Sequence, residues 1–193
     1  MAGILLVRHG ALPPNPERRF TGALDIPLSD AGRAQIRALG RELGATARDV
    51  TAIVASDLAR CRETAALLAR TLARHIGRDI PLHTDAALRE INLGLWQGLT
   101  PAEVERAFPG QYAQRGQDMA GFCPPEGESF FCVQRRALAA LERWRKRCPD
   151  GILLVAAHAG VNRTLLARYL ALPLAELQRI PQHYACWAFL AGW

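Results

Sequence analysis

Two short apolar runs in this chain each end on a histidine. Residues 3–7 lead into Arg8 and His9, and residues 151–157 lead into His158. A short, β-branched apolar run bounded by glycine predicts a buried strand of a parallel sheet. Ligands of open α/β sheets lie beyond the carboxyl ends of the strands, so both imidazoles are expected at that edge. With a guanidinium beside them, they predict a site for an anionic, phosphorylated ligand.

Strand and helix signals alternate along the chain, which predicts an α/β sandwich. Strands are expected over residues 3–7, 51–55, 81–88, 151–157 and 184–190, the third at an edge because Pro81 begins it. Helices are expected over residues 29–43, from Ser56 onward, and over 100–108, 128–147 and 161–172, with Ser29, Ser56 and Thr100 as caps. Residues 11–28 and 110–127 are expected to be irregular. The 193 residues contain no repeat or linker, so a single domain over residues 1–193 is expected.

The chain is basic, with a net charge of +6, and Lys146 is its one lysine among 24 basic residues. The arginines are spread along the chain at helix-surface spacings. This distribution favours solvated helix faces over a nucleic-acid interface, so no nucleic-acid partner is expected.

The five cysteines indicate the compartment. Their number is odd and no pair has C-x-x-C spacing, which argues against a disulfide framework or a zinc site and favours a reducing cytoplasm. The N-terminal apolar run is too short for the core of a signal peptide, and no stretch is long enough to span a membrane. We therefore expect a cytoplasmic protein with no membrane partner.

The tripeptide Arg8-His9-Gly10 carries specific chemistry. A neutral imidazole nitrogen can attack phosphorus and hold a phosphoryl group covalently. The phosphoryl oxygens need positive charge in the transition state, which a planar guanidinium supplies. Glycine beside the histidine allows the backbone to approach the phosphate closely.

Five motifs, taken together and in order, resemble the histidine phosphatase (phosphoglycerate mutase-like) superfamily over nearly the whole chain. They are Arg8-His9-Gly10 with Asn15 and Arg19-Phe20-Thr21-Gly22, the run Ser56-Asp57-Leu58-Ala59-Arg60, Leu88-Arg89-Glu90 followed by Gly94-Leu95-Trp96-Gln97-Gly98, Pro125-Glu126-Gly127-Glu128-Ser129, and His158-Ala159-Gly160-Val161. The resemblance implies a three-layer α/β/α sandwich with a mostly parallel central sheet. Three positions depart from the common pattern, namely Ala11, Gln97 and Ala159, and none of them removes a catalytic group.

The resemblance also implies roles for individual residues. His9 is the nucleophile, and Arg8, Arg60 and His158 form a cationic pocket around the phosphoryl oxygens. Glu90 protonates the leaving oxygen and then activates water. Binding contacts are implied for Gly10, Asn15, Thr21, Gly22 and Ala159. No metal and no cofactor are expected, because the arginines supply the charge that magnesium supplies elsewhere.

Each of these residues also has a purely structural interpretation. Arg60 could lie on a helix surface, Glu90 could be a solvated loop carboxylate, and His158 could be a hydrogen-bonded histidine at a strand end. These interpretations do not explain the order and spacing of the motifs. Asn162 stays ambiguous, since it could shape the pocket, and Arg163 is interpreted as a helix-surface residue.

The favoured function is a phosphomonoesterase acting on a small phosphorylated metabolite through a phosphohistidine. The C-terminal motifs resemble α-ribazole phosphatases, which suggests α-ribazole 5'-phosphate as a substrate. One alternative is a phosphoglycerate mutase, which dependence on a bisphosphorylated primer would reveal. Another is a catalytically weak phospho-ligand binding protein, which an aryl phosphate assay would reveal. The expected partner is a small phosphate ester, and the oligomeric state is left open, with a homodimer as one option.

Overall fold

The centre of the structure, a computed structural model that describes residues 2–44 and 47–192, is a five-stranded sheet. Its strands lie in the order β3 (Leu82–Thr84), β2 (Val50–Ala55), β4 (Ile152–Ala157), β1 (Gly3–Arg8) and β5 (Trp187–Ala191). The first four strands of this order run parallel, and β5 is antiparallel to β1. The predicted mostly parallel sheet is confirmed.

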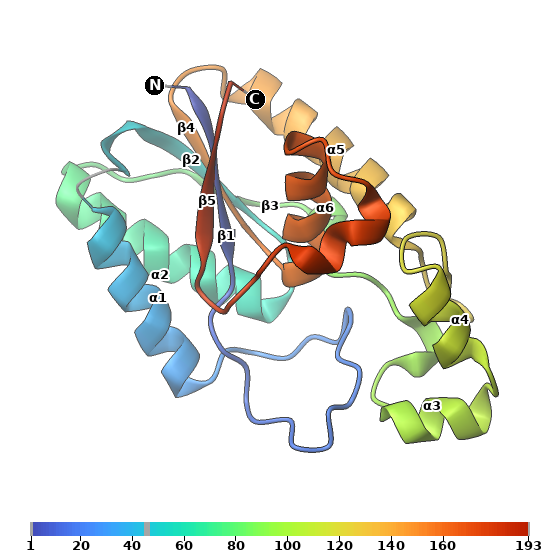
Figure 1. Ribbon diagram of the computed structural model, residues 1–193. Helices are drawn as coiled ribbons and strands as arrows, with labels where there is room; N and C mark the ends of the chain where they lie inside the picture. Colours follow the sequence, from blue (N-terminus) through green and yellow to red (C-terminus); the bar gives the residue numbers. More distant parts are fainter. Residues whose placement is uncertain (1, 45–46, 193) are drawn as a thin grey trace.

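Helices cover both faces of the sheet (Figure 1). The helices α1 (Asp30–Leu43) and α2 (Ala59–Ile76) cover one face, and α5 (Phe130–Arg147) and α6 (Ala159–Tyr169) cover the other. Because side chains alternate along a strand, β1 feeds two separate cores. Leu5 belongs to the core under α1 and α2, and Leu6 belongs to the core under α5 and α6. The three-layer α/β/α sandwich is therefore confirmed.

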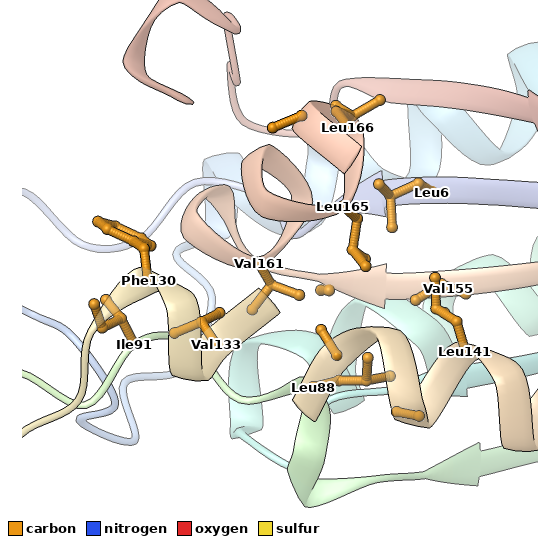
Figure 2. Close-up of a cluster of buried hydrophobic side chains, with 14 of the residues drawn as sticks. Leu6, Leu88, Ile91, Phe130, Val133, Leu141, Val155, Val161, Leu165 and Leu166 are labelled. Atoms are coloured by element: carbon orange, nitrogen blue, oxygen red, sulfur yellow. The ribbon is translucent and has the colours of Figure 1, made fainter. Parts of the chain in front are cut away.

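The core under α5 and α6 is closely packed in the region next to the site. Figure 2 shows Val161 and Leu165 of α6 facing Val133 of α5, beside the strand residues Leu6 and Val155. All five side chains have at most 1% of their surface exposed. Burying such side chains contributes about 1.5–3 kcal/mol each, so α6 is held firmly against the sheet.

Several predicted helix boundaries are confirmed by their caps. The hydroxyl of Ser29 accepts from the backbone N–H of Gly32 and begins α1 as expected. Thr100 and Glu103 form the predicted capping box of α3 (Pro101–Ala107). The predicted cap at Ser56 is wrong, because α2 begins only at Ala59 and the Ser56 hydroxyl accepts from Leu58 in the preceding turn.

Three other expectations are corrected by the structure. The predicted strand over 81–88 ends at Thr84, since the Asp85 carboxylate accepts from Ala87 and starts a 3-10 turn. The segment 110–127 contains the helix α4 (Gln111–Gln117), which the sequence did not signal because this helix has no buried residue. The last strand begins at Trp187 rather than at 184. Further 3-10 turns span Ala47–Asp49, Gly94–Trp96 and Leu174–Arg179.

The register of the two central strands places the two histidines together. Strand β1 pairs in parallel with β4, and Arg8 is opposite Ala157 at the end of the ladder. His9 and His158 are the next residues on the two strands, and the backbone N–H of His9 donates to the Ala157 carbonyl. The loop of residues 11–28 and the helices α3 and α4 lie at this same end of the molecule (Figure 1).

Candidate active site

His9 is held neutral and in one tautomer. Its Nδ1 lies 2.8 Å from the carbonyl oxygen of Gly10. A carbonyl can only accept, so Nδ1 carries the proton and Nε2 keeps its lone pair. The pKa of His9 is lowered to about 3, mainly by burial and in part by the charges of Arg60 and Arg8. The hydrogen bond to Gly10 acts in the opposite direction and raises this pKa. A neutral imidazole with a free Nε2 is the form that a nucleophile requires.

His158 lies beside His9, with the two ring centroids 5.2 Å apart. The Nε–H of Arg60 donates to Nδ1 of His158 across 3.1 Å, and Nε2 of His158 lies 3.4 Å from the Sγ of Cys61. Burial, and then the charge of Arg60, lower the pKa of His158 well below its ordinary value. The structure therefore brings His158 to the site as predicted, but as a neutral ring and not as a cation.

Arg60 points into the interior, where 1% of the residue is exposed. Its terminal nitrogens donate to the carbonyls of Leu24 (2.5 Å) and Gly22 (2.9 Å). The interpretation of Arg60 as a helix-surface residue is therefore wrong. A guanidinium has five N–H groups, so two remain for an anion after these three bonds.

Arg8 supplies the second guanidinium of the site. It stacks on the ring of Tyr184 at 4.1 Å from the centroid, and one terminal nitrogen donates to the Gln182 carbonyl. Its Nε is buried without a hydrogen-bond partner. Buried donors are nearly always paired, so this group is ready for an anionic acceptor.

Tyr184 and Gln182, which both contact Arg8, belong to the site and were not predicted from the sequence. The Gln182 side chain accepts from the amide of Asn162 at 3.0 Å, and the Gln182 carbonyl accepts from Arg8, so Asn162 contacts the segment that holds Arg8. Arg163, expected on the surface, is half-buried and its Nε donates to the Ile180 carbonyl. No local pattern signals these contacts, because they join segments that are far apart in the sequence.

Glu90 is a half-buried carboxylate next to the first turn of α6, the helix that follows His158. Its oxygens accept from the backbone N–H groups of Ile91 and Gly160, both at 3.0 Å. Gly160 lies in the first turn of α6, so this bond ties Glu90 to the beginning of that helix. A Cβ on Gly160 would lie 2.3 Å from the Glu90 carboxylate, so a side chain there would displace the carboxylate from its present position. Glu90 is therefore a fixed group and not a solvated loop carboxylate.

The loop that carries Glu90 is held from α5. The Arg136 guanidinium donates to the carbonyls of Ala87 (2.7 Å) and Glu90 (3.3 Å). It also forms a two-pronged ion pair with Glu128, which accepts from the backbone N–H of Asn92. Arg136 was not among the residues predicted for the site, and it holds Glu90 indirectly.

The predicted binding residues lie around this centre. Thr21 and Gly22 lie in the loop that Arg60 holds, and Ala159 is the half-buried first residue of α6. Asn15 is exposed, and its amide bonds the backbone of Arg19.

At Gly10 the structure shows a packing constraint beside the predicted binding role. A Cβ there would lie 2.4 Å from the Gly32 carbonyl, so its missing side chain makes room for α1. The remaining histidines, expected to be structural, are His75, His83 and His183, and all three are exposed.

Positive charge at the site comes from Arg8 and Arg60. Within residues 2–44 and 47–192 no group of three or more His, Cys, Asp or Glu side chains could hold a metal ion. The same described residues include no helix long and apolar enough to cross a bilayer. What the arrangement can do chemically is bind a phosphoryl group next to a neutral nucleophile.

Comparison with known proteins agrees with this geometry. The profile of the "Histidine phosphatase superfamily (branch 1)" matches residues 4–191. The chain is 34% identical over 198 residues to a glucosyl-3-phosphoglycerate phosphatase of Mycolicibacterium vanbaalenii, covering 98% of this chain and 84% of the relative. It is 30% identical over 183 residues to an adenosylcobalamin/alpha-ribazole phosphatase of Salmonella typhimurium, covering 95% and 87%. The solved structure of a mycobacterial glucosyl-3-phosphoglycerate phosphatase superposes with a TM-score of 0.80 at 32% identity, covering 96% of this chain and 88% of that one.

The chain therefore belongs to the histidine phosphatase superfamily, as its motifs predicted. The two relatives named above are phosphatases of small phosphorylated metabolites. Within the superfamily, this protein is a phosphoric monoester hydrolase.

Proposed function

We propose that the protein hydrolyses a small phosphate monoester through a phosphohistidine formed on Nε2 of His9. The observation that carries this proposal is the bond from Nδ1 of His9 to the Gly10 carbonyl. It leaves Nε2 as the free nucleophilic nitrogen, in a ring that burial holds neutral. Arg8 and Arg60 can then neutralise the negative charge of the phosphoryl oxygens.

The reaction has two displacements at phosphorus. In the first, Nε2 of His9 bonds to phosphorus while the bond from phosphorus to the ester oxygen breaks, and the protonated carboxyl of Glu90 gives its proton to that oxygen. The alcohol leaves. In the second, the Glu90 carboxylate takes a proton from water as the water oxygen bonds to phosphorus and the P–N bond breaks. Inorganic phosphate leaves, and both residues return to their starting state.

His158 has a defined part in this scheme. In the structure it accepts from Arg60, so it orients the guanidinium toward the phosphoryl site. The predicted cationic role stays a prediction, and it requires that a bound dianion raise the pKa of His158. A nearby negative charge acts in that direction.

Rapid-quench experiments with labelled substrate test the covalent step. We expect an acid-labile, base-stable phosphoenzyme in the native protein and none in His9→Ala, which should also lose turnover. The exposed His183→Gln variant is the control. Normal turnover in His9→Ala would contradict the covalent mechanism.

The specific substrate is a further proposal. α-Ribazole 5'-phosphate is the candidate that the C-terminal motifs suggest, and the printed names of the relatives add glucosyl-3-phosphoglycerate. Release of phosphate from a panel of metabolite phosphates would distinguish them. A phosphoglycerate mutase would instead need a bisphosphorylated primer, and a weak phospho-ligand binder would not hydrolyse 4-nitrophenyl phosphate.

Location and assembly are proposals of the same kind. We propose that the protein acts in the cytoplasm, on the ground of its odd number of cysteines without C-x-x-C spacing. We also propose that it binds no nucleic acid, since several of its arginines are engaged with carboxylates and carbonyls. A homodimer is left as one option for its assembly, and light scattering after size exclusion measures it directly. Likewise, one domain over the whole chain is expected to unfold in a single calorimetric transition.

A further inference from the structure

A pocket of about 280 Å³ lies in the loop that follows His9. We call it the side pocket. Its walls are mostly apolar and include Leu12, Pro13, Phe20, Leu24, Ile26 and Tyr184. Apolar walls around a concave space are what a ligand's apolar part requires.

The side pocket adjoins the phosphoryl site through a shared wall. Tyr184 lines the pocket, its ring centroid lies 5.7 Å from that of His9, and its face carries the Arg8 guanidinium. Thr21 lines the pocket too. A group bonded to a phosphate at His9 can therefore extend along Tyr184 into the pocket.

The same pocket also lies toward the proposed general acid. Gly22 follows Thr21, and a Cβ on Gly22 would lie 3.0 Å from the carbonyl oxygen of Ile91. Ile91 is the neighbour of Glu90, so the backbone next to the lining residue Thr21 packs against the segment that carries the proposed acid.

The wall of the pocket is fixed before any ligand binds. One terminal nitrogen of Arg19 donates to the Gly98 carbonyl and to Glu103 in the first turn of α3, at 2.8 Å each. Asn15 bonds the Arg19 backbone in both directions. A preformed wall needs little ordering on binding, which favours affinity.

The charge in the pocket is already neutralised. Among the described residues that line it, Arg19 is the one cation, and its Nε donates to Glu17 at 2.8 Å while its terminal nitrogen meets Glu103. Four of the five N–H groups of Arg19 are thus engaged within the protein, and its charge is balanced by two carboxylates, so it offers little to a second acid group of a ligand. A carboxylate placed against these apolar walls would lose its hydration without a counter-ion.

We infer that the side pocket binds an uncharged, largely apolar ring of the leaving group. The preferred substrates are then phosphate monoesters of ring-bearing alcohols, rather than phosphates that carry a second acid group. This inference rests on the proposed function, because it places the ring relative to a phosphoryl group at His9. The volume lies just under the range of about 300–1,000 Å³ typical of drug-sized ligands, so one or two rings fit.

Binding of non-hydrolysable phosphonates tests the inference independently of catalysis. Isothermal titration would compare propylphosphonate, 3-phenylpropylphosphonate and 3-phosphonopropanoate. Because a phenyl ring buries apolar surface on the order of 100 Å², we expect its dissociation constant to be about 10- to 100-fold below that of propylphosphonate. The carboxylate of 3-phosphonopropanoate should bring no gain.

A matched pair of variants locates the effect. Leu24 and Leu172 each have 37% of their surface exposed, and only Leu24 lines the pocket. Leu24→Asp should lose most of the gain from the phenyl ring, and it retains the backbone carbonyl that Arg60 uses. Leu172→Asp should keep the gain.

The outcomes separate this inference from the proposed function. Equal affinity for the phenyl and propyl compounds, or tightest binding of 3-phosphonopropanoate, would overturn the inference. If the protein hydrolyses 4-nitrophenyl phosphate but binds the phenyl compound no more tightly than the propyl compound, the inference is wrong and the proposed function stands. Ring-selective binding without any hydrolysis would support the side pocket and overturn the proposed catalysis.

Discussion

The Nε–H of Arg60 donates to Nδ1 of His158 across 3.1 Å, and this contact joins two residues that are 98 positions apart in the chain. Arg60 is the second residue of α2, and His158 follows β4 directly. The bond fixes the tautomer of His158, since its Nδ1 must accept. Together with the bonds to Leu24 and Gly22, it holds the Arg60 guanidinium in the interior of the site.

We expect Arg60→Lys to lower kcat by about 10²- to 10³-fold, the loss typical when one donor to a developing charge is removed. Lysine keeps the charge but lacks the planar fork that meets His158, Gly22 and Leu24 together. Steady-state kinetics with 4-nitrophenyl phosphate would measure the loss. Circular dichroism would show whether the variant stays folded.

Arg62→Lys is the matched control for this prediction. Arg62 lies two residues further along α2 and is exposed. It should retain nearly full activity. If Arg60→Lys is as active as Arg62→Lys, then positive charge alone suffices and the three-way fork has no catalytic role.

Stability should fall as the solution becomes more acidic, in part because of His9. The unfolded chain binds a proton at His9 near pH 6.5, whereas the folded protein does so only near pH 3. Between these values the unfolded state binds more protons, so unfolding becomes easier as the pH falls. At pH 5 the effect of His9 amounts to about 2 kcal/mol.

Urea unfolding at pH 7.5 and pH 5 measures this effect. The native protein should lose about 2 kcal/mol more than His9→Gln over this interval, because the amide does not titrate. The exposed His183→Gln variant should follow the native protein. An equal loss in the native protein and His9→Gln would mean that burial does not hold His9 neutral.

The parts of the fold that could be predicted are those with strong local signals. The runs that became β1, β2 and β4 were located to within one residue, because buried parallel strands are continuously apolar. The helix α4 was missed because none of its side chains is buried and it shows no apolar face. Its boundary is set by Gly110 at φ 78°, a backbone feature that composition alone does not reveal.

The candidate site divides in the same way. His9 and His158 could be placed by the strand-end argument alone, while Arg60 and Glu90 needed the family resemblance. The contact from Arg8 to Gln182 joins residues 174 positions apart, and no local pattern encodes it. Likewise, the neutral state of His158 depends on burial among groups from other elements, which only the folded structure shows.

We expect chelation to leave the activity unchanged. Arg8 and Arg60 can stabilise the negative charge on the phosphoryl oxygens. In other phosphoryl-transfer enzymes a metal ion has this role. Activity toward 4-nitrophenyl phosphate would be measured after dialysis against EDTA, with a zinc-dependent phosphatase treated in parallel. A large loss that magnesium or zinc restores would show that the arginines are not the source of charge.

Glu90→Gln should slow the first chemical step according to the leaving group. An alkyl alkoxide needs a proton as it departs, and general acid help is typically worth about 10²–10⁴-fold. A nitrophenolate leaves without that help, so its transfer to His9 should slow far less. The amide can accept from only one of the two backbone N–H groups that hold Glu90, those of Ile91 and Gly160. Some loss of positioning should therefore affect both esters.

Single-turnover kinetics separate two effects of Glu90→Gln, the loss of the proton donor and the loss of positioning. Loss of positioning slows both esters by the same factor, whereas loss of the acid slows the alkyl ester by an additional factor. Glu126→Gln is the control, since Glu126 is exposed beside the same loop. Equal slowing of the first step for both esters would mean that Glu90 is not the acid. Two other carboxylates near the site, Glu17 and Asp25, are already engaged with Arg19 and the Ala59 backbone, and they would be tested next.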